Sequence, residues 1–485
     1  MRMLALAIAV LCAGEAAPQR DWSAALRTDA AAMHDAIAAN HPGPVNPADP
    51  SFAARNDEQL QRALRRAQAA KTFEDYFYAM QEYAASFDDG HLSYGVFGNT
   101  PDEVRKWPGF LTRYDGNGNQ MVFVAEPDSG VPTGARLLSC DGIAADALTS
   151  NRLGSRFGRW QLASQHELLG AMAFLDVGDP YVLTPRRCRF SIAGRTIDLA
   201  LRWRPPQENL YERYVVGKST RAEIGWSVLN NGAQWFRMPS FDGNPNSPVG
   251  QRLRELIGYM QSHSADIRAA PAIVFDLRGN GGGSSDWAYQ IARALWGEGA
   301  MLRRSEAPMT VSWRASRDNL AFIRTSFAER SKGGNLSPEA KSWYEDTIAH
   351  LDQAIAAGNA LWVAKPTYVD TETRAKGLPS YKVQAPVYVI TDPNCMSACL
   401  DAVDLWTSMG AVTAGRETGA DTTYMEVRMV KLPAGIGSFS LPMKAYSGRP
   451  RGSNQPVSPK YRFDGDMADT ASLQNWVSGL PKLSQ

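Results

Sequence analysis

Two continuous apolar runs constrain the fold of this chain more than any other feature. They are PAIVFDL (residues 271–277) and PVYVITD (residues 386–392), and each is followed by a turn of small residues and an amphipathic helix, SSDWAYQIARALW or SACLDAVDLWTSMG. A strand with one face in water alternates apolar and polar residues, so an uninterrupted apolar run predicts a strand that is buried on both faces. The sequence therefore predicts an α/β fold with a core of buried strands followed by helices.

The segments before this core differ from it in composition. Residues 22–87 are rich in Ala, Leu, Arg, Glu and Gln, which favours helices, and Thr72 with Asp75 predicts a capping box. Short alternating runs follow and end in a hairpin that should turn at Ala193 and Gly194. We predict a signal peptide at 1–17, a helical N-terminal domain at 18–105 that ends in a DGH turn, a β-rich domain at 106–205, and an α/β core at 206–485 with a helical insertion at about 306–365.

The N-terminus and the overall charge narrow the location and the partners. Arg2 precedes the apolar run Met3–Ala13, which is too short to span a bilayer and is followed by small residues. A short helix of the fold is the alternative, but export to the periplasm or out of the cell is favoured. No later run reaches 18 continuous apolar residues, so we expect no membrane span. The 51 basic and 50 acidic residues nearly cancel, which argues against nucleic-acid binding.

Four cysteines remain if the N-terminal segment is removed. An exported chain can form disulfides, and proximity in the sequence favours Cys395 with Cys399 and, by default, Cys140 with Cys188. None of the six histidines lies near Cys395 with the spacing of zinc ligands, so we expect no metal site.

Two turns follow the buried strands and could carry chemistry. DLRGNGGGSS (residues 276–285) lacks the spacing of a phosphate loop or a dinucleotide turn, which leaves an oxyanion hole or a tight packing turn. Ser397 occupies the corresponding place after the second strand, where α/β enzymes present a nucleophile. A helix N-cap is the alternative role for Ser397, and Cys395 or Cys399 is a rival nucleophile. A serine nucleophile needs a base, and His91 in the turn DDGHLSYG is the candidate.

The order of these motifs resembles that of the C-terminal processing, or tail-specific, peptidases, a family whose wider membership includes the tricorn protease core. The matching features are DGH, GARLLSCDGIAADAL (residues 134–148), DLRGNGGG, the serine, and GRET. The resemblance implies a PDZ-like domain at 106–205, with residues 134–148 as its ligand-groove segment. It also implies that Ser397 is the nucleophile and that the amides of Ala398, Gly281 and Gly282 are the oxyanion donors.

The base differs from that of many family members. Asp421, in GRETGADT, stands where those members carry a lysine, which favours the tricorn-like arrangement with His91 as base. Glu417 is the first choice for the acid that orients His91, with Asp421, Asp88 and Asp89 as alternatives. Glu417 could equally be a solvated charge or a partner of Arg416.

These features together predict a secreted or periplasmic serine-type endopeptidase that acts on peptide or protein substrates without a metal or an organic cofactor. Two alternatives use the same architecture. One is a non-catalytic member that binds a peptide or an apolar ligand, and the other is an esterase.

Overall fold

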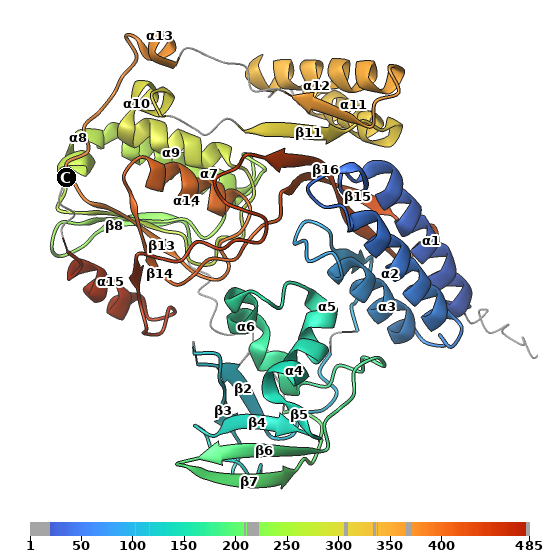
Figure 1. Cartoon of the computed structure of the whole chain (residues 1–485). Helices are drawn as coiled ribbons and strands as arrows, with labels where there is room; N and C mark the ends of the chain where they lie inside the picture. The colour runs from blue at the N-terminus through green and yellow to red at the C-terminus, as the bar shows by residue number, and fades with distance from the viewer. Residues whose placement is uncertain are drawn as a thin grey trace, which may run out of the picture.

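The computed structural model describes residues 20–101, 103–115, 117–207, 210, 223–304, 309–332, 336, 338–364 and 371–481. The predicted signal peptide lies outside these residues. The chain folds into a mixed α/β structure in which a helix-covered core sheet, a bundle of N-terminal helices and a small β-rich unit lie side by side (Figure 1).

The core sheet contains both of the apolar runs. As far as the chain is described, its strands lie in the order β17 (Tyr461–Arg462), β14 (Val412–Gly415), β13 (Val387–Thr391), β10 (Ile273–Asp276), β9 (Gln234–Arg237) and β8 (Gly225–Val228). All neighbours are parallel except β8 and β9. Every residue of β10 and β13 is buried, which confirms the prediction of strands covered on both faces.

Helices cover the two faces of this sheet. On one face Ile273 and Phe275 pack with α7 (Pro248–Ser262), α9 (Asp286–Trp296) and α14 (Ala398–Ser408). On the other face Val274 packs with α15 (Thr470–Ser478). The shorter helices of this part are α8 (Ser264–Ala269), α10 (Glu298–Leu302) and α13 (Thr371–Ala375). Because successive side chains of a strand point to opposite faces, an unbroken apolar run serves both layers.

The N-terminal helices share their core with strands from distant parts of the chain. The helices are α1 (Trp22–Asn40), the short η1 (Gly43–Val45), α2 (Phe52–Ala67) and α3 (Phe73–Ala85). Thr72 and Asp75 form the predicted capping box of α3. The helices pack against a sheet made of β1 (Tyr94–Val96), β11 (Thr310–Arg314), β12 (Leu361–Ala364), β15 (Tyr424–Lys431) and β16 (Gly437–Ser447).

The insertion predicted at about 306–365 belongs to this second sheet. It contains the helices α11 (Arg317–Lys332) and α12 (Pro338–Ala356), as expected, but strands β11 and β12 flank them. β11 pairs with both β12 and β16. The two strands were not predicted, because β11 pairs with the distant β16 and with β12 across the insertion, so no local pattern marks the pairing.

The β-rich unit carries the first disulfide. Its strands are β2 (Phe110–Tyr114), β3 (Gln120–Ala125), β4 (Arg136–Cys140), β5 (Ile143–Ala144), β6 (Arg187–Ile192) and β7 (Arg195–Ala200). Its helical segments are α4 (Ala145–Thr149), η2 (Ser150–Gly154), α5 (Ser155–Phe157), α6 (Ala163–Leu169) and η3 (Gly170–Phe174). The β6–β7 hairpin turns at Ala193 (φ 46°) and Gly194 (φ 79°), as predicted. Cys140 lies opposite Cys188 in the sheet, and the two are joined.

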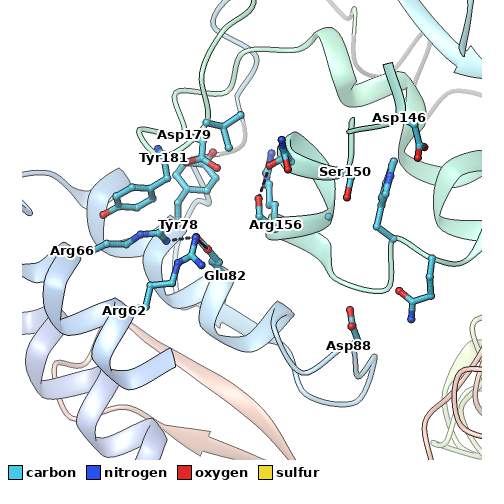
Figure 2. A pocket seen from close by; sticks show the side chains of 16 residues that line it. Arg62, Arg66, Tyr78, Glu82, Asp88, Asp146, Ser150, Arg156, Asp179 and Tyr181 are labelled. Atoms are coloured by element: carbon cyan, nitrogen blue, oxygen red, sulfur yellow. Dashed lines mark hydrogen bonds and ion pairs between the residues drawn. The ribbon is translucent and has the colours of Figure 1, made fainter. Parts of the chain in front are cut away.

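A cavity of about 720 Å³ separates the N-terminal helices from the helical side of the β-rich unit. Arg62 and Arg66 of α2 pair with Glu82 of α3 on one wall, and Ser150 lies on the other (Figure 2). Asp88, in the turn that contains His91, also lines this cavity. Within the described ranges, no helix is both long enough and apolar enough to cross a bilayer.

Candidate active site

Ser397 lies where the two apolar strands end together. β10 and β13 are parallel neighbours, so the DLRGNGGG turn and the Ser397 turn meet at one edge of the core sheet. Ser397 precedes α14 with φ 54° and ψ −127°, a backbone conformation that costs a non-glycine residue about 1–3 kcal/mol. Its side chain makes no capping hydrogen bond, although the residue occupies the N-cap position. The strain is typical of a nucleophile presented at a sharp strand-to-helix turn.

Two buried carboxylates hold the backbone of this turn. The Ser397 amide lies 2.9 Å and 3.1 Å from the two oxygens of Asp421 and donates to that carboxylate. Asp392 accepts from the amide of Gly279 at 2.9 Å and from that of Asn394 at 3.0 Å, which ties the two turns together. Burial raises the pKa of Asp392 to about 6. Asp421 stands where many of the resembling peptidases carry a lysine, and here it holds the backbone of the serine.

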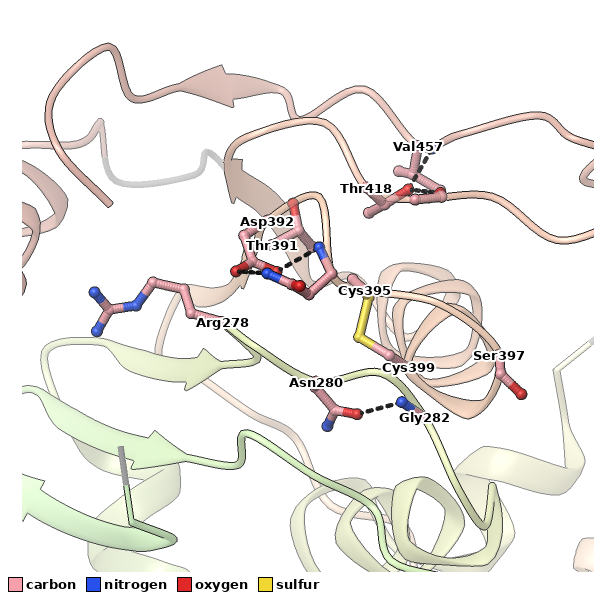
Figure 3. Close-up of a disulfide and its surroundings, with 12 residues drawn as sticks. Arg278, Asn280, Gly282, Thr391, Asp392, Cys395, Ser397, Cys399, Thr418 and Val457 are labelled. Atoms are coloured by element: carbon pink, nitrogen blue, oxygen red, sulfur yellow. Dashed lines mark hydrogen bonds between the residues drawn. A yellow bond between two sulfur atoms is a disulfide. The ribbon is translucent and has the colours of Figure 1, made fainter. Parts of the chain in front are cut away.

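The glycine-rich turn packs directly on the serine. Gly282 has φ 98°, and a Cβ built on it would lie 2.7 Å from both Ser397 Cβ and the Met396 carbonyl oxygen. The Gly282 amide donates to Asn280 Oδ1 at 2.9 Å, so it is already engaged and differs from the free oxyanion donor that was expected (Figure 3). Among the described residues, no hydrogen bond engages the amides of Gly281 and Ala398.

The first residues of DLRGNGGG form a buried ion pair that the sequence analysis did not anticipate. Arg278 donates to Asp276 through Nη2 at 2.6 Å and through Nε at 2.8 Å, and both side chains are almost fully buried. Trp235 Nε1 also donates to Asp276, at 3.1 Å. The pattern that could have revealed the pair is an acidic residue at the end of a buried strand with a basic residue two positions later. The pair fixes the start of the glycine turn.

His91 lies in a turn that is held by a buried carboxylate. Its Nδ1 is 3.7 Å from Asp89 Oδ1, and its amide donates to the same oxygen at 2.9 Å. Thr422 Oγ1 donates to Asp89 Oδ1 at 2.9 Å, and Ser440 Oγ donates to the His91 carbonyl at 2.7 Å. The side chain of Asp89 is 1% exposed, and burial raises its pKa although His91 opposes the shift.

The His91 turn and the Ser397 turn meet on one short segment. Asp421 binds the amide of Ser397 and the next residue, Thr422, binds Asp89. Arg159 adds a second bridge, because its amide donates to Asp88 while its Nη1 lies 3.7 Å from Met396 Sδ. Within the described ranges, no hydrogen bond joins the His91 imidazole to Ser397 Oγ. The two turns are therefore linked through residues 421–422.

Glu417, the first choice for the orienting acid, has another partner. Ser458 Oγ donates to it at 2.9 Å, and in the part of the chain that the structure describes no ion pair joins it to His91. The reason is local, because Thr418 donates through its amide to the Val457 carbonyl and directs this segment toward residues 457–458. Asp89, one of the alternatives, is the carboxylate beside His91.

The second disulfide joins cysteines on either side of the serine in the sequence. Cys395 and Cys399 are bonded to each other and fully buried, and they lie with Gly282 and Ser397 at the start of α14 (Figure 3). Both disulfides have the pairing that the sequence favoured. Neither cysteine of this pair is a free thiol that could replace Ser397 as nucleophile. Among the described residues, no group of three His, Cys, Asp or Glu side chains is placed to hold a metal ion.

Known proteins resemble the chain in both sequence pattern and fold. A model of peptidase family S41 matches residues 235–446, which include the glycine-rich turn and the Ser397 turn. The structure of mature CPAF complexed with lactacystin is similar, with a TM-score of 0.58, 14% identity, and coverage of 94% of this chain and 97% of that one. A structure of mature CPAF gives a TM-score of 0.58, 13% identity, and coverage of 94% and 96%. No curated protein matches the chain.

Proposed function

We propose, from the match of residues 235–446 to the model of peptidase family S41, that the protein is a serine peptidase that cleaves peptide or protein substrates through an acyl-enzyme. The observation that carries the proposal is the strained backbone of Ser397, at the end of a buried strand and against a glycine-rich turn. Such strain persists only where surrounding structure enforces it, and it concentrates at functional sites.

The proposed reaction needs a base, a nucleophile and oxyanion donors from this chain, and one water molecule. His91 takes the proton of Ser397 Oγ, and the oxygen attacks the carbonyl carbon of the substrate. The amides of Ala398 and Gly281 donate to the oxyanion of the tetrahedral intermediate. His91 then gives its proton to the leaving amine, and water, activated by the same imidazole, hydrolyses the acyl ester and restores Ser397.

Asp89 orients His91 in this proposal, in place of Glu417. A buried carboxylate that faces Nδ1 keeps the proton on that nitrogen and leaves Nε2 free to act as the base. The 3.7 Å separation between Asp89 Oδ1 and His91 Nδ1 is slightly longer than a hydrogen bond. Catalytic hydrogen bonds often shorten when substrate binds, so this distance suits an unliganded site.

The surroundings support a role outside the cytoplasm. Two disulfides join buried cysteines, which is typical of chains that fold in an oxidising compartment. Together with the apolar N-terminal run, they favour a periplasmic or secreted protein. The cavity that reaches Asp88 lies beside the His91 turn and offers an approach for an extended peptide. The PDZ-like assignment of the β-rich unit is part of the proposal.

Labelling with a fluorophosphonate probe tests the proposal. The wild type should be labelled at Ser397, and Ser397→Ala should abolish labelling, while His91→Ala should slow it by at least 100-fold because the base is lost. Ser408→Ala, at the far end of α14, is the control and should be labelled like the wild type. Labelling that survives Ser397→Ala would overturn the assignment of the nucleophile.

Substrate screens separate the remaining possibilities. Turnover of peptides over matched esters is expected for a peptidase, and turnover of esters alone would point to the esterase. A wild type that binds peptides but reacts with neither substrate nor probe would be the non-catalytic member, and the peptidase proposal would then fail.

A further inference from the structure

The Cys395–Cys399 disulfide encloses the residues that the proposed reaction needs most. The two cysteines are separated by 4 positions in the sequence, and Met396, Ser397 and Ala398 lie between them. Ser397 is the proposed nucleophile, and the amide of Ala398 is a proposed oxyanion donor. The Met396 carbonyl is the group against which Gly282 packs. The cross-link therefore closes a small covalent ring that includes the backbone of Ser397 and Ala398.

The ring opposes relaxation of the strained serine. If Ser397 moved to an ordinary extended conformation, the segment could lengthen at that residue, because an extended residue advances the chain by about 3.3 Å and a helical residue by about 1.5 Å. The disulfide holds the Cα atoms of Cys395 and Cys399 at 5.3 Å. A reduced segment has no such limit, and noncovalent contacts would then hold the Ser397 turn, namely the Asp421 carboxylate, the first turn of α14 and the packing of Gly282.

The bond is well anchored on both sides. Cys395 donates through its amide to the Asp392 carbonyl at 3.0 Å, and Asp392 is tied to the glycine turn through Gly279. Cys399 lies in the first turn of α14, and both sulfur-bearing side chains belong to the apolar core beneath that helix. The ring thus transmits the position of two fixed elements to Ser397.

We propose that the Cys395–Cys399 disulfide is a positioning element of the nucleophile, so that the oxidised chain acylates rapidly and the reduced chain binds substrate but acylates slowly. The inference rests on the proposed peptidase function. Formation of the bond removes two protons and two electrons from the thiols, and a disulfide donor of the oxidising compartment accepts the electrons and is reduced to thiols. Full activity would accordingly require oxidation of the chain.

The second disulfide of the chain provides a matched control. Cys395→Ala/Cys399→Ala should lower the fluorophosphonate labelling rate at least 30-fold, whereas Cys140→Ala/Cys188→Ala should leave it within threefold of wild type. The small probe phosphonylates Ser397 Oγ with loss of fluoride, so its labelling rate reports on the reactivity of the nucleophile that acylation also requires. In a Ser397→Ala background, the Kd of a substrate peptide should differ by less than threefold between proteins with and without Cys395 and Cys399. A role in stability alone would not separate binding from acylation in this way.

A redox cycle on one protein covers the case in which the double variant does not fold. The Cys140→Ala/Cys188→Ala protein is reduced with dithiothreitol in mild urea, with complete reduction verified by mass after iodoacetamide trapping of a parallel sample. Labelling should fall at least 30-fold and should recover when oxidised glutathione restores the bond.

Each failure has a distinct appearance. If reduced and oxidised proteins are labelled at equal rates, or if both double variants lose labelling equally, the positioning role is wrong although the wild type is still labelled. If the oxidised wild type is never labelled, the proposed function itself fails.

Discussion

The two disulfides are chemically identical and differ in what they enclose. Cys140–Cys188 joins directly opposed residues of β4 and β6 and closes a loop with a sequence separation of 48. Cys395–Cys399 closes a loop with a separation of 4 around Ser397. The first fastens two strands that are already hydrogen-bonded neighbours. The second restricts a backbone conformation that its own residues do not favour.

On the positioning role proposed for Cys395–Cys399, the shorter loop has the larger effect on the reaction, whereas the longer loop has the larger effect on stability. In the chain-entropy account, a cross-link stabilises the fold by restricting the unfolded chain, and a longer loop gives the larger effect. Restriction of the native backbone at a reactive residue depends on position and not on loop length. Four sets of substitutions test this contrast between the two disulfides.

The largest expected effect is on stability. Cys140→Ala/Cys188→Ala should lower the free energy of unfolding by about 4 kcal/mol and Cys395→Ala/Cys399→Ala by about 2 kcal/mol, from the dependence on loop size. Thermal unfolding of both variants, compared with the wild type, measures the difference. If the short loop proves the more stabilising one, loop entropy does not govern the pair, and the contrast has to be redrawn.

Next in size is the pH dependence of stability that arises from Asp392, beside the Ser397 turn. The pKa of Asp392 is raised to about 6 in the folded protein, against about 3.9 in an unfolded chain. Between these values the folded state binds the proton more tightly, so this group's contribution to stability is lost as pH rises from about 4 to 6. The loss amounts to about 3 kcal/mol.

Asp392→Asn isolates that effect, because it removes the titrating group and keeps the size of the side chain. The melting temperature of the variant relative to wild type should rise between pH 4 and pH 7. Cys140→Ala/Cys188→Ala should show no such relative rise. Parallel pH profiles of Asp392→Asn and wild type would contradict the raised pKa.

A third change displaces the serine without touching the sulfur atoms. Gly282→Ala would place a methyl group 2.7 Å from Ser397 Cβ at a residue with φ 98°, and kcat should fall about 100-fold, equivalent to about 2.7 kcal/mol. Gly243→Ala is the control, because nothing lies within 4 Å of its added Cβ. Equal kcat values for the two variants would show that the serine tolerates displacement. They would also argue against the need for a positioning element at Ser397.

The smallest effect concerns the other support of Ser397. Asp421→Asn keeps one oxygen that can accept from the Ser397 amide and loses the charge, so we expect kcat to fall about tenfold with little change in KM. Combination with Cys395→Ala/Cys399→Ala should reduce kcat by more than the product of the separate effects, since both supports hold one backbone. Independent effects in a double-mutant cycle would show that the supports act on different features.

Local patterns predicted the parts of the fold that depend on local interactions. The buried strands at 273–276 and 387–391, the capping box of Thr72 and the hairpin at Ala193 all follow from residue type and spacing, and the structure contains them. The family resemblance, and not a local pattern, implied that Ser397 acts with the glycine turn, and the structure brings the two together because β10 and β13 are parallel neighbours.

Features that depend on distant contacts escaped prediction. Nothing in residues 310–314 announces a partner strand at 444–447. The choice between Glu417 and Asp89 depended on how the chain leaves β14, which the contact of Thr418 with Val457 decides. The Gly282 amide could not be recognised as engaged either, since its acceptor is a side chain, Asn280, whose orientation the sequence does not specify.

The sheet that joins β1 to β16 has a consequence for the timing of activity. The carbonyl of His91 is held by Ser440, 349 positions later in the chain, and β1 pairs with β16 directly after His91. A ribosome that delivers the chain from the N-terminus completes Ser397 before it completes the strand that secures His91. On the proposed mechanism, the nascent polypeptide therefore lacks a contact that secures its base until Ser440 in β16 has been synthesised.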